Sequence, residues 1–238
     1  MVPFSFCSQE LILLDPPPSV GGSRSARHGS ALYWPCEQAL LVADLHLEKA
    51  SFYARGGQML PPYDSRETLE RLAHAVRRTG ARRVFALGDN FHDSVGPDRL
   101  ESHAAGMLDA LTRSLDWVWI TGNHDHALAD GLGGTRVEEI AVSGIDLRHQ
   151  ASRDATGPEM SGHFHPRLVV STRGRRIARP CAVQSETRLI LPAFGALTGG
   201  MDAGAPEILS ALQPASAIDA LVPAREKLLR YPLWRKAA

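Results

Sequence analysis

Two residues of the kind that bind divalent metal ions end an early apolar run of this sequence. The run LLVADLHLE carries Asp44 and His46 two positions apart. Because side chains alternate along a strand, both point to the same side at its carboxyl end. A lone pair of this kind is more often a surface aspartate beside a histidine at the edge of the core, so the pair by itself predicts little.

Two further apolar runs end in the same residue types. RVFALG leads to Asp89, and WVWIT leads to Asn123 and His124. Gly88 and Gly122 stand at the two junctions, where glycine permits tight backbone turns. Ligand sites in open α/β sheets collect beyond the carboxyl ends of strands, so we expect the three junctions to converge.

A later segment adds more imidazoles. GHFH places His163 and His165 two positions apart, and His149 closes a short strand between GNHD and GHFH. Imidazole and carboxylate suit manganese, iron or zinc, and the scarcity of cysteine argues against a thiolate site. A carboxylate can bridge two ions, and Asp89 is the best-isolated acid at a strand end. The pattern predicts two divalent ions about 3.5 to 4 Å apart that hydrolyse a phosphate ester.

Short β-rich runs are the elements that must position these side chains. Two helical patterns, 65–79 and 98–114, separate the early strands and carry apolar residues at three- and four-residue spacing. After residue 123 the chain is rich in strands, with a terminal helical stretch expected near 217–230. The alternation predicts a layered α/β or α+β sandwich. Strands are expected at 10–14, 31–34, 39–43, 83–87, 117–121, 136–142, 145–148, 160–162, 168–172, 182–184 and 188–192.

Length and composition narrow the classes of protein. The 238 residues show no internal repeat and no convincing linker, so we expect one domain over residues 1–238. Three cysteines without a C-x-x-C pair favour a reducing cytoplasm over a disulfide framework. We find no export signal and no apolar stretch near the ~20 residues that cross a bilayer, so no membrane partner is expected.

Charge gives only a local hint of a polyanion. Lys plus Arg and Asp plus Glu both total 26, so the overall field does not favour nucleic acid. The segment STRGRRIARP concentrates Arg173, Arg175, Arg176 and Arg179, with no aromatic residues between them for base stacking. A solvated hairpin tip and a surface that contacts phosphate explain this cluster equally well.

The order D-x-H, GD, GNHD and GHFH resembles the calcineurin-like metallophosphoesterase superfamily. The resemblance implies a four-layer sandwich, with two central mixed β-sheets flanked by helices. It implies that His124 lies beside the scissile phosphate without touching metal. His149 rests on position alone, and its alternative is a structural hydrogen bond. By the same resemblance, Asp44, His46, Asp89 and His165 hold one metal ion, and Asp89, Asn123, His149 and His163 hold the other.

One block departs from the pattern of this superfamily. Its usual GD-x-x-D reads GDNFHD here, which puts His92 where the second Asp normally falls and displaces Asp93 by one position. Either residue can hold the role of orienting a metal-bound histidine. Neither is counted as a ligand.

Longer phrases, ADLHLEKA, LPPYD, LGDNFHD, WVWITGNHD and LPAFGALTGG, resemble the bacterial DNA ligase-associated metallophosphoesterases of the PdeM type over about residues 32–201. This resemblance implies a phosphodiesterase or endonuclease acting on DNA in damage repair, alongside an ATP-dependent DNA ligase, a helicase and an exonuclease. Two alternatives stay open. One is a phosphodiesterase or pyrophosphatase for a small nucleotide or lipid-linked substrate, and the other is a non-catalytic scaffold without metals.

The expected chemistry follows from two bound metal ions, most simply manganese, with iron or zinc as alternatives. A hydroxide bridging the ions is the expected nucleophile, because coordination lowers the pKa of water from about 15.7 to about 7. A protonated His124 donates to the leaving alkoxide. Asp125 either tunes that imidazole or caps its loop.

Overall fold

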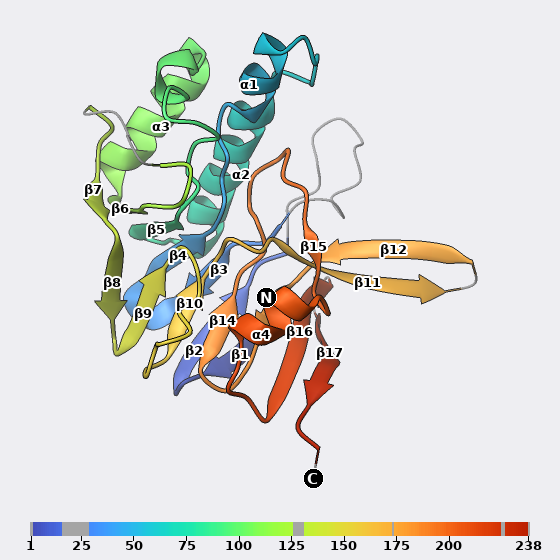
Figure 1. Ribbon diagram of the computed structural model, residues 1–238. Helices are drawn as coiled ribbons and strands as arrows, with labels where there is room; N and C mark the ends of the chain where they lie inside the picture. The colour runs from blue at the N-terminus through green and yellow to red at the C-terminus, as the bar shows by residue number, and fades with distance from the viewer. Residues whose placement is uncertain (1, 16–28, 126–130, 173, 225–226, 238) are drawn as a thin grey trace.

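Two seven-stranded β-sheets pack face to face, and helices cover their outer surfaces (Figure 1). The computed structural model describes residues 2–15, 29–125, 131–172, 174–224 and 227–237. One hydrophobic cluster fills the space between the sheets, and two others lie under the covering layers. The mixed α/β sandwich predicted from the sequence is confirmed.

The first sheet has the order β1-β2-β3-β4-β5-β6-β7. Strands β1 to β4 run antiparallel to their neighbours, and β4 to β7 run parallel. The parallel half brings three strand ends to one edge, which is where the site forms. The strands are β1 (Pro3–Phe6), β2 (Gln9–Leu13), β3 (Leu32–Trp34), β4 (Ala39–Val42), β5 (Arg83–Leu87), β6 (Asp116–Ile120) and β7 (Thr135–Val137).

The central strands of this sheet are apolar on both faces because both faces are covered. In β4, Leu40 packs under the helices, whereas Leu41 packs against the second sheet. Leu69 and Leu72 of α2 and Leu108 of α3 complete the outer layer. Among the described residues, no helix is long and apolar enough to cross a membrane. The helices on this side are α1 (Lys49–Arg55), α2 (Asp64–Thr79) and α3 (Ser102–Ser114).

Helix α3 begins four residues later than the expected 98. The carboxylate of Glu101 accepts the backbone N–H groups of His103 and Ala104, which caps the first turn. The preceding residues form a separate short 3-10 turn, Pro97–Arg99. The start of the helix is therefore decided by a side-chain cap and not by apolar spacing.

The second sheet has the order β17-β16-β13-β14-β10-β9-β8. Strand β10 runs parallel to both β9 and β14, so the ends of β9 and β10 lie side by side. Helix α4 (Pro206–Ala211) packs on the outer face. The strands are β8 (Glu139–Val142), β9 (Ile145–Arg148), β10 (Glu159–Ser161), β13 (Ala182–Gln184), β14 (Arg188–Ile190), β16 (Ala217–Ala224) and β17 (Lys227–Arg235).

The helical stretch expected near 217–230 is wrong, because residues 217–224 form β16 and residues 227–230 belong to β17, which pairs antiparallel with β16. Strand β16 pairs with β13 on one side and with β17 on the other. Its residues 218–222 are all buried, since Leu221 contacts the core between the sheets while Ile218 and Ala220 lie in the cluster under α4. A strand buried on both faces loses two-residue alternation, so periodicity does not distinguish it from a helix.

A small third sheet, in the order β12-β11-β15, extends from the body as a projecting hairpin (Figure 1). Strand β11 (Pro166–Thr172) begins directly after His165 and pairs with β12 (Arg175–Pro180) and β15 (Met201–Asp202). Of the arginine cluster, Arg175, Arg176 and Arg179 are exposed on β12, and Arg173 lies outside the described residues.

Candidate metal centre

The chemistry-bearing residues lie where strand ends from both large sheets meet. Asp44 follows β4, Asp89 follows β5 and Asn123 follows β6, at the carboxyl edge of the parallel half. His149 follows β9 and His163 follows β10, whose ends lie together in the other sheet. The convergence expected from the three junctions is therefore what the fold produces.

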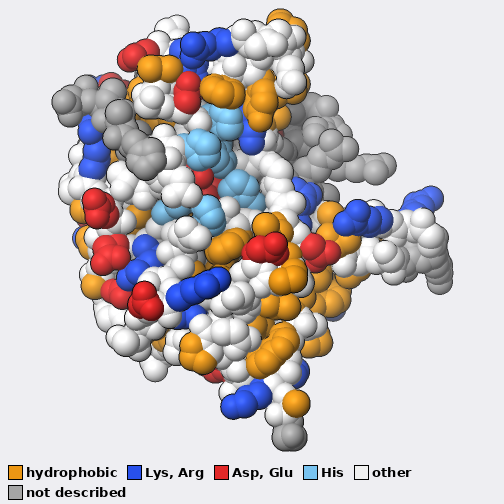
Figure 2. Space-filling view, in the orientation of Figure 1, with side chains coloured by type: hydrophobic (Ala, Val, Ile, Leu, Met, Phe, Trp, Pro, Cys, Tyr) orange, Lys and Arg blue, Asp and Glu red, His pale blue; other side chains and the backbone are white. Residues whose placement is uncertain are grey.

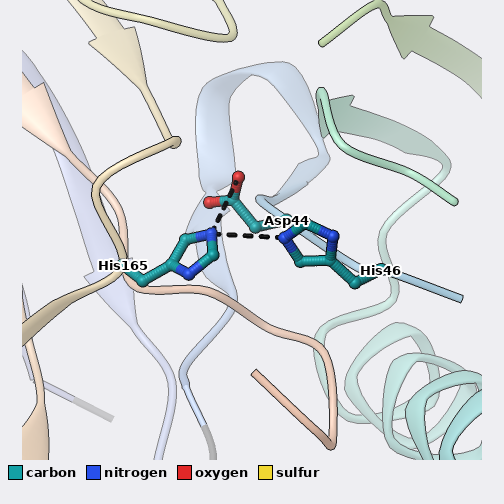
Figure 3. Close-up of side chains that lie close together, drawn as sticks. All are labelled: Asp44, His46 and His165. Carbon is teal, nitrogen blue, oxygen red and sulfur yellow. Dashed lines mark hydrogen bonds and ion pairs between the residues drawn. The ribbon is translucent and has the colours of Figure 1, made fainter. Parts of the chain in front are cut away.

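Asp44, His46 and His165 form a first group, with one ligand atom from each within 4.8 Å of the others (Figure 3). The Nε2 atom of His165 lies 3.4 Å from Nε2 of His46 and 3.4 Å from Oδ1 of Asp44. Asp44 and His46 come from the segment after β4 and His165 from the segment before β11, and the three side chains point toward one another (Figure 3). Imidazole nitrogens and a carboxylate that point toward one point are the donors that a cation placed there would bind. This donor set therefore fits a divalent metal.

Asp89, His149 and His163 form a second group by the same measure. Nδ1 of His163 lies 3.1 Å from Nε2 of His149, and that nitrogen lies 3.6 Å from Oδ1 of Asp89. The amide of Asn123 is at the rim of the group, 3.5 Å from Nδ1 of His163. Its carboxamide can turn oxygen or nitrogen to this point, so it can complete the donor set.

His149, which no motif supported, is oriented by the backbone. Its Nδ1 lies 3.0 Å from the carbonyl oxygen of Leu87, which can only accept, so Nδ1 carries the proton. Nε2 then turns its lone pair to the second group, as in other histidines held for metal binding. Gly88 leaves room for the ring, because a Cβ there would lie 2.3 Å from Nδ1.

Asp89 faces both groups. Its Oδ1 lies 3.6 Å from Nε2 of His149, and its Oδ2 lies 3.8 Å from Nε2 of His46. The backbone N–H of His124 donates to Oδ1 at 3.0 Å and helps to orient the carboxylate. Gly122 permits this close packing, since a Cβ there would lie 2.5 Å from Oδ1. One carboxylate with an oxygen toward each group has the arrangement of a bridging ligand.

The backbone is strained where these side chains gather. Left-handed conformations are uncommon for residues other than glycine and cost about 1 kcal/mol or more each. They persist only where the surrounding structure enforces them, and they concentrate at functional sites. The strained residues in the two groups are Asp44 (φ 53°), His46 (φ 42°), Asp89 (φ 48°), His163 (φ 72°) and His165 (φ 49°).

Burial keeps key imidazoles neutral. It lowers the pKa of His46 to about 2, with the nearby His165 as the next cause, and it also lowers the pKa of His163. A protonated imidazole cannot bind a metal ion, so a depressed pKa keeps the ligand nitrogen available at neutral pH.

His124 belongs to neither group. Its side chain is 45% exposed, and its Nε2 lies 3.9 Å from Oδ2 of Asp89. The ring stacks on that of His92, with centroids 5.5 Å apart and planes 16° from parallel. His124 therefore stands beside the metal groups on their solvent side, where a substrate would meet it.

His92 and Asp93, the two residues in question in the altered GDNFHD block, make different contacts. Asp93 accepts hydrogen bonds from both terminal nitrogens of Arg99, at 3.0 and 2.5 Å, and lies 3.8 Å from Arg55. The ring of His92 meets that of His46 edge-on, with centroids 5.6 Å apart. Of the two, His92 contacts a candidate ligand, and it does so by ring packing.

Asp125 caps the loop. Its buried carboxylate accepts the backbone N–H groups of Gly122 and Asn90, at 2.9 and 3.0 Å, and the side-chain amide of Asn90 at 2.8 Å. Burial raises the pKa of this carboxyl group. These bonds join the turns after β5 and β6, which supports the loop-capping alternative for this residue.

A pocket of about 700 Å³ opens beside the second group, bordered by Asn123 and His149. Its charged lining residues lie on β7, β8, β9 and the loop between β7 and β8. These segments carry no motif, so the sequence did not predict that they would line a pocket. Arg148 is engaged by the carboxylates of Glu139 and Glu159. The charged lining residues are Arg136, Glu138, Glu139 and Arg148.

Comparison with known proteins agrees with this arrangement. The family model described as calcineurin-like phosphoesterase matches residues 38–167, more than half of the chain. The chain belongs to the calcineurin-like phosphoesterase family. It is therefore a metal-dependent phosphoesterase, and the two groups are candidates for the divalent metals that this family uses.

Among solved structures, this phosphoesterase is similar to the nuclease MPE of Pseudomonas putida, with 29% identity and a TM-score of 0.68. That match covers 98% of this chain and 99% of the nuclease. Yfce, a phosphoesterase from E. coli, matches with 14% identity and a TM-score of 0.42, over 82% of this chain and 98% of the other. A search among curated proteins finds no match.

Proposed function

We propose that this phosphoesterase is a binuclear phosphodiesterase that cuts DNA. The observation that carries the proposal is Asp89, whose two oxygens face two separate groups of ligand nitrogens. Manganese is the proposed metal, with iron or zinc as alternatives, because the donors are imidazole, carboxylate and amide. The proposed holders are Asp44, His46, Asp89 and His165 for one ion, and Asp89, Asn123, His149 and His163 for the other.

Bound divalent ions would supply Lewis-acid activation of water and would neutralise phosphate oxygens. The protein's own groups prepare this chemistry. His149 keeps its proton on Nδ1 and its lone pair inside the site, through Leu87. His124, at the open side, can hydrogen-bond a substrate phosphate oxygen and pass a proton to the leaving oxygen.

The choice of DNA rests on similarity and on surface shape. The nuclease MPE is 29% identical over nearly the whole chain, and the phrases of the sequence resemble the PdeM type. The exposed arginines of β12 stand on a projecting hairpin that begins directly after His165, where they can meet a polyanion. We further propose that the chain acts as one domain in the cytoplasm, in DNA repair with an ATP-dependent DNA ligase, a helicase and an exonuclease.

The test combines metal analysis with a substrate panel. We expect about two equivalents of metal to remain after dialysis, and we expect manganese to support cleavage of single-stranded DNA and of an aryl phosphodiester. Cleavage of cyclic nucleotides or aryl esters without any cleavage of DNA would favour the small-substrate alternative. A protein that retains no stoichiometric metal and cleaves nothing would be the scaffold, and the proposed function would be wrong.

A further inference from the structure

Four aromatic rings line one side of the metal centre and are here called the aromatic wall: Phe52, Tyr53, His92 and His124. The ring of His92 lies at its middle, 4.7 Å from Phe52, 5.6 Å from Tyr53 and 5.5 Å from His124, measured between centroids. Two rings come from α1, one from the GDNFHD block and one from GNHD. Segments distant in the sequence thus build one continuous surface.

The wall is open to solvent at both ends. Phe52 is 39% exposed and the side chain of His124 is 45% exposed. In the segment between α1 and α2, Leu60 and Tyr63 are also exposed. Figure 2 shows hydrophobic side chains bordering the band of histidines at the end of the molecule that carries α1 in Figure 1. Packing of the hydrophobic core does not explain why large rings are this exposed.

The position of the wall indicates what would cover it. His124 belongs both to the wall and to the surroundings of Asp89, so a phosphate at the metal groups would lie next to the wall. Lys49, the first residue of α1, adds a positive charge beside His92. The rings of Tyr53, His92 and His124 stack on one another, and Phe52 meets His92 edge-on. Exposed aromatic rings next to a phosphate site and a cation suit a nucleobase attached to that phosphate.

We propose that the aromatic wall stacks one unpaired nucleobase that flanks the scissile phosphodiester. This inference rests on the proposed nuclease function and names the form of its substrate. A base within a duplex has both faces covered by its neighbours, so stacking on the wall requires a single strand or a frayed end.

The experiment uses the metal-loaded enzyme and an end-labelled single-stranded oligothymidylate with one stable abasic residue at its centre. In the wild type, we expect the bond on one side of the abasic residue to be cut about 5- to 150-fold more slowly than the others, the range for stacking one base. Phe52→Ala should slow the other bonds by a factor in this range and leave the abasic bond unchanged. Phe52→Trp should keep the wild-type cleavage pattern, because tryptophan also provides a stacking surface.

The matched control is Leu229→Ala on β17, an equally exposed apolar residue at the opposite end of the molecule, which should leave the cleavage pattern unchanged. The proposal is overturned if wild-type enzyme cuts all bonds of the abasic strand equally. It is also overturned if Phe52→Ala slows every bond, the abasic one included, by the same factor, since that result shows only a disturbed site. Absence of any DNA cleavage by the wild type would instead remove the proposed function.

Discussion

The carboxylate of Asp44 accepts the backbone N–H of His163 with both of its oxygens, at 3.1 and 3.0 Å. This contact joins the end of β4 in the first sheet to the loop after β10 in the second. The same aspartate faces His165 in the first metal group. One side chain therefore joins the two sheets and also belongs to a candidate metal group.

Asp44→Asn should lose metal from the first group and lower turnover at least about 100-fold, because a neutral amide is a weaker ligand than a carboxylate. Asp44→Ala should also unfold more easily, by about 1 to 3 kcal/mol, because the N–H of His163 loses its acceptor. Metal analysis, steady-state kinetics and urea denaturation measure these effects. Retention of both metals by Asp44→Asn would contradict the assignment of this residue.

Gly122→Ala should greatly reduce metal binding and activity, because its Cβ would lie 2.3 Å from the backbone nitrogen and 2.5 Å from Oδ1 of Asp89. The matched control is Gly106→Ala in α3, where a Cβ would meet nothing within 4 Å. That change should stabilise the protein by about 0.5 to 1 kcal/mol and leave activity intact, because alanine favours helix. Equal activity of the two variants would show that Asp89 does not need this close packing.

His124→Ala should keep its metals and lose turnover by about 100- to 10,000-fold, the usual contribution of a positioned acid or base. The reason is that the ring lies outside both metal groups but beside Asp89. Metal content after dialysis and kcat on an aryl phosphodiester are the two readouts. His103→Ala, at an exposed position on α3, is the control and should match the wild type. An unchanged kcat for His124→Ala would remove this residue from the mechanism.

Cys181 should resist alkylation in the folded protein well above pH 9. Burial raises the pKa of its thiol to about 12, so the reactive thiolate stays scarce as the pH rises. Cys36, which is exposed, serves as the internal control and should react first. Iodoacetamide labelling from pH 7 to pH 10, read by mass spectrometry of peptides, checks this order. Labelling of Cys181 at the rate of Cys36 would mean that the cluster under α4 opens readily.

The candidate ligands after β4, β5 and β6 were predictable because each stands directly after an apolar strand. Local spacing determines which side chains follow a strand, and parallel pairing of neighbouring strands then brings Asp44, Asp89 and Asn123 to one edge. The kinds of donor were likewise set by the sequence. The sandwich of sheets and helices followed from the same alternation of elements.

Long-range packing decided the rest. Residues 217–224 carried an apolar run that suited a helix, and only their place between β13 and β17 in the second sheet made them a strand. The orientation of His149 depends on the Leu87 carbonyl, 62 positions away. Asp89 turns one oxygen to each metal group because loops from both sheets meet around it. Spacing along the chain determines which groups are present, whereas only the packed sheets determine which atoms face one another.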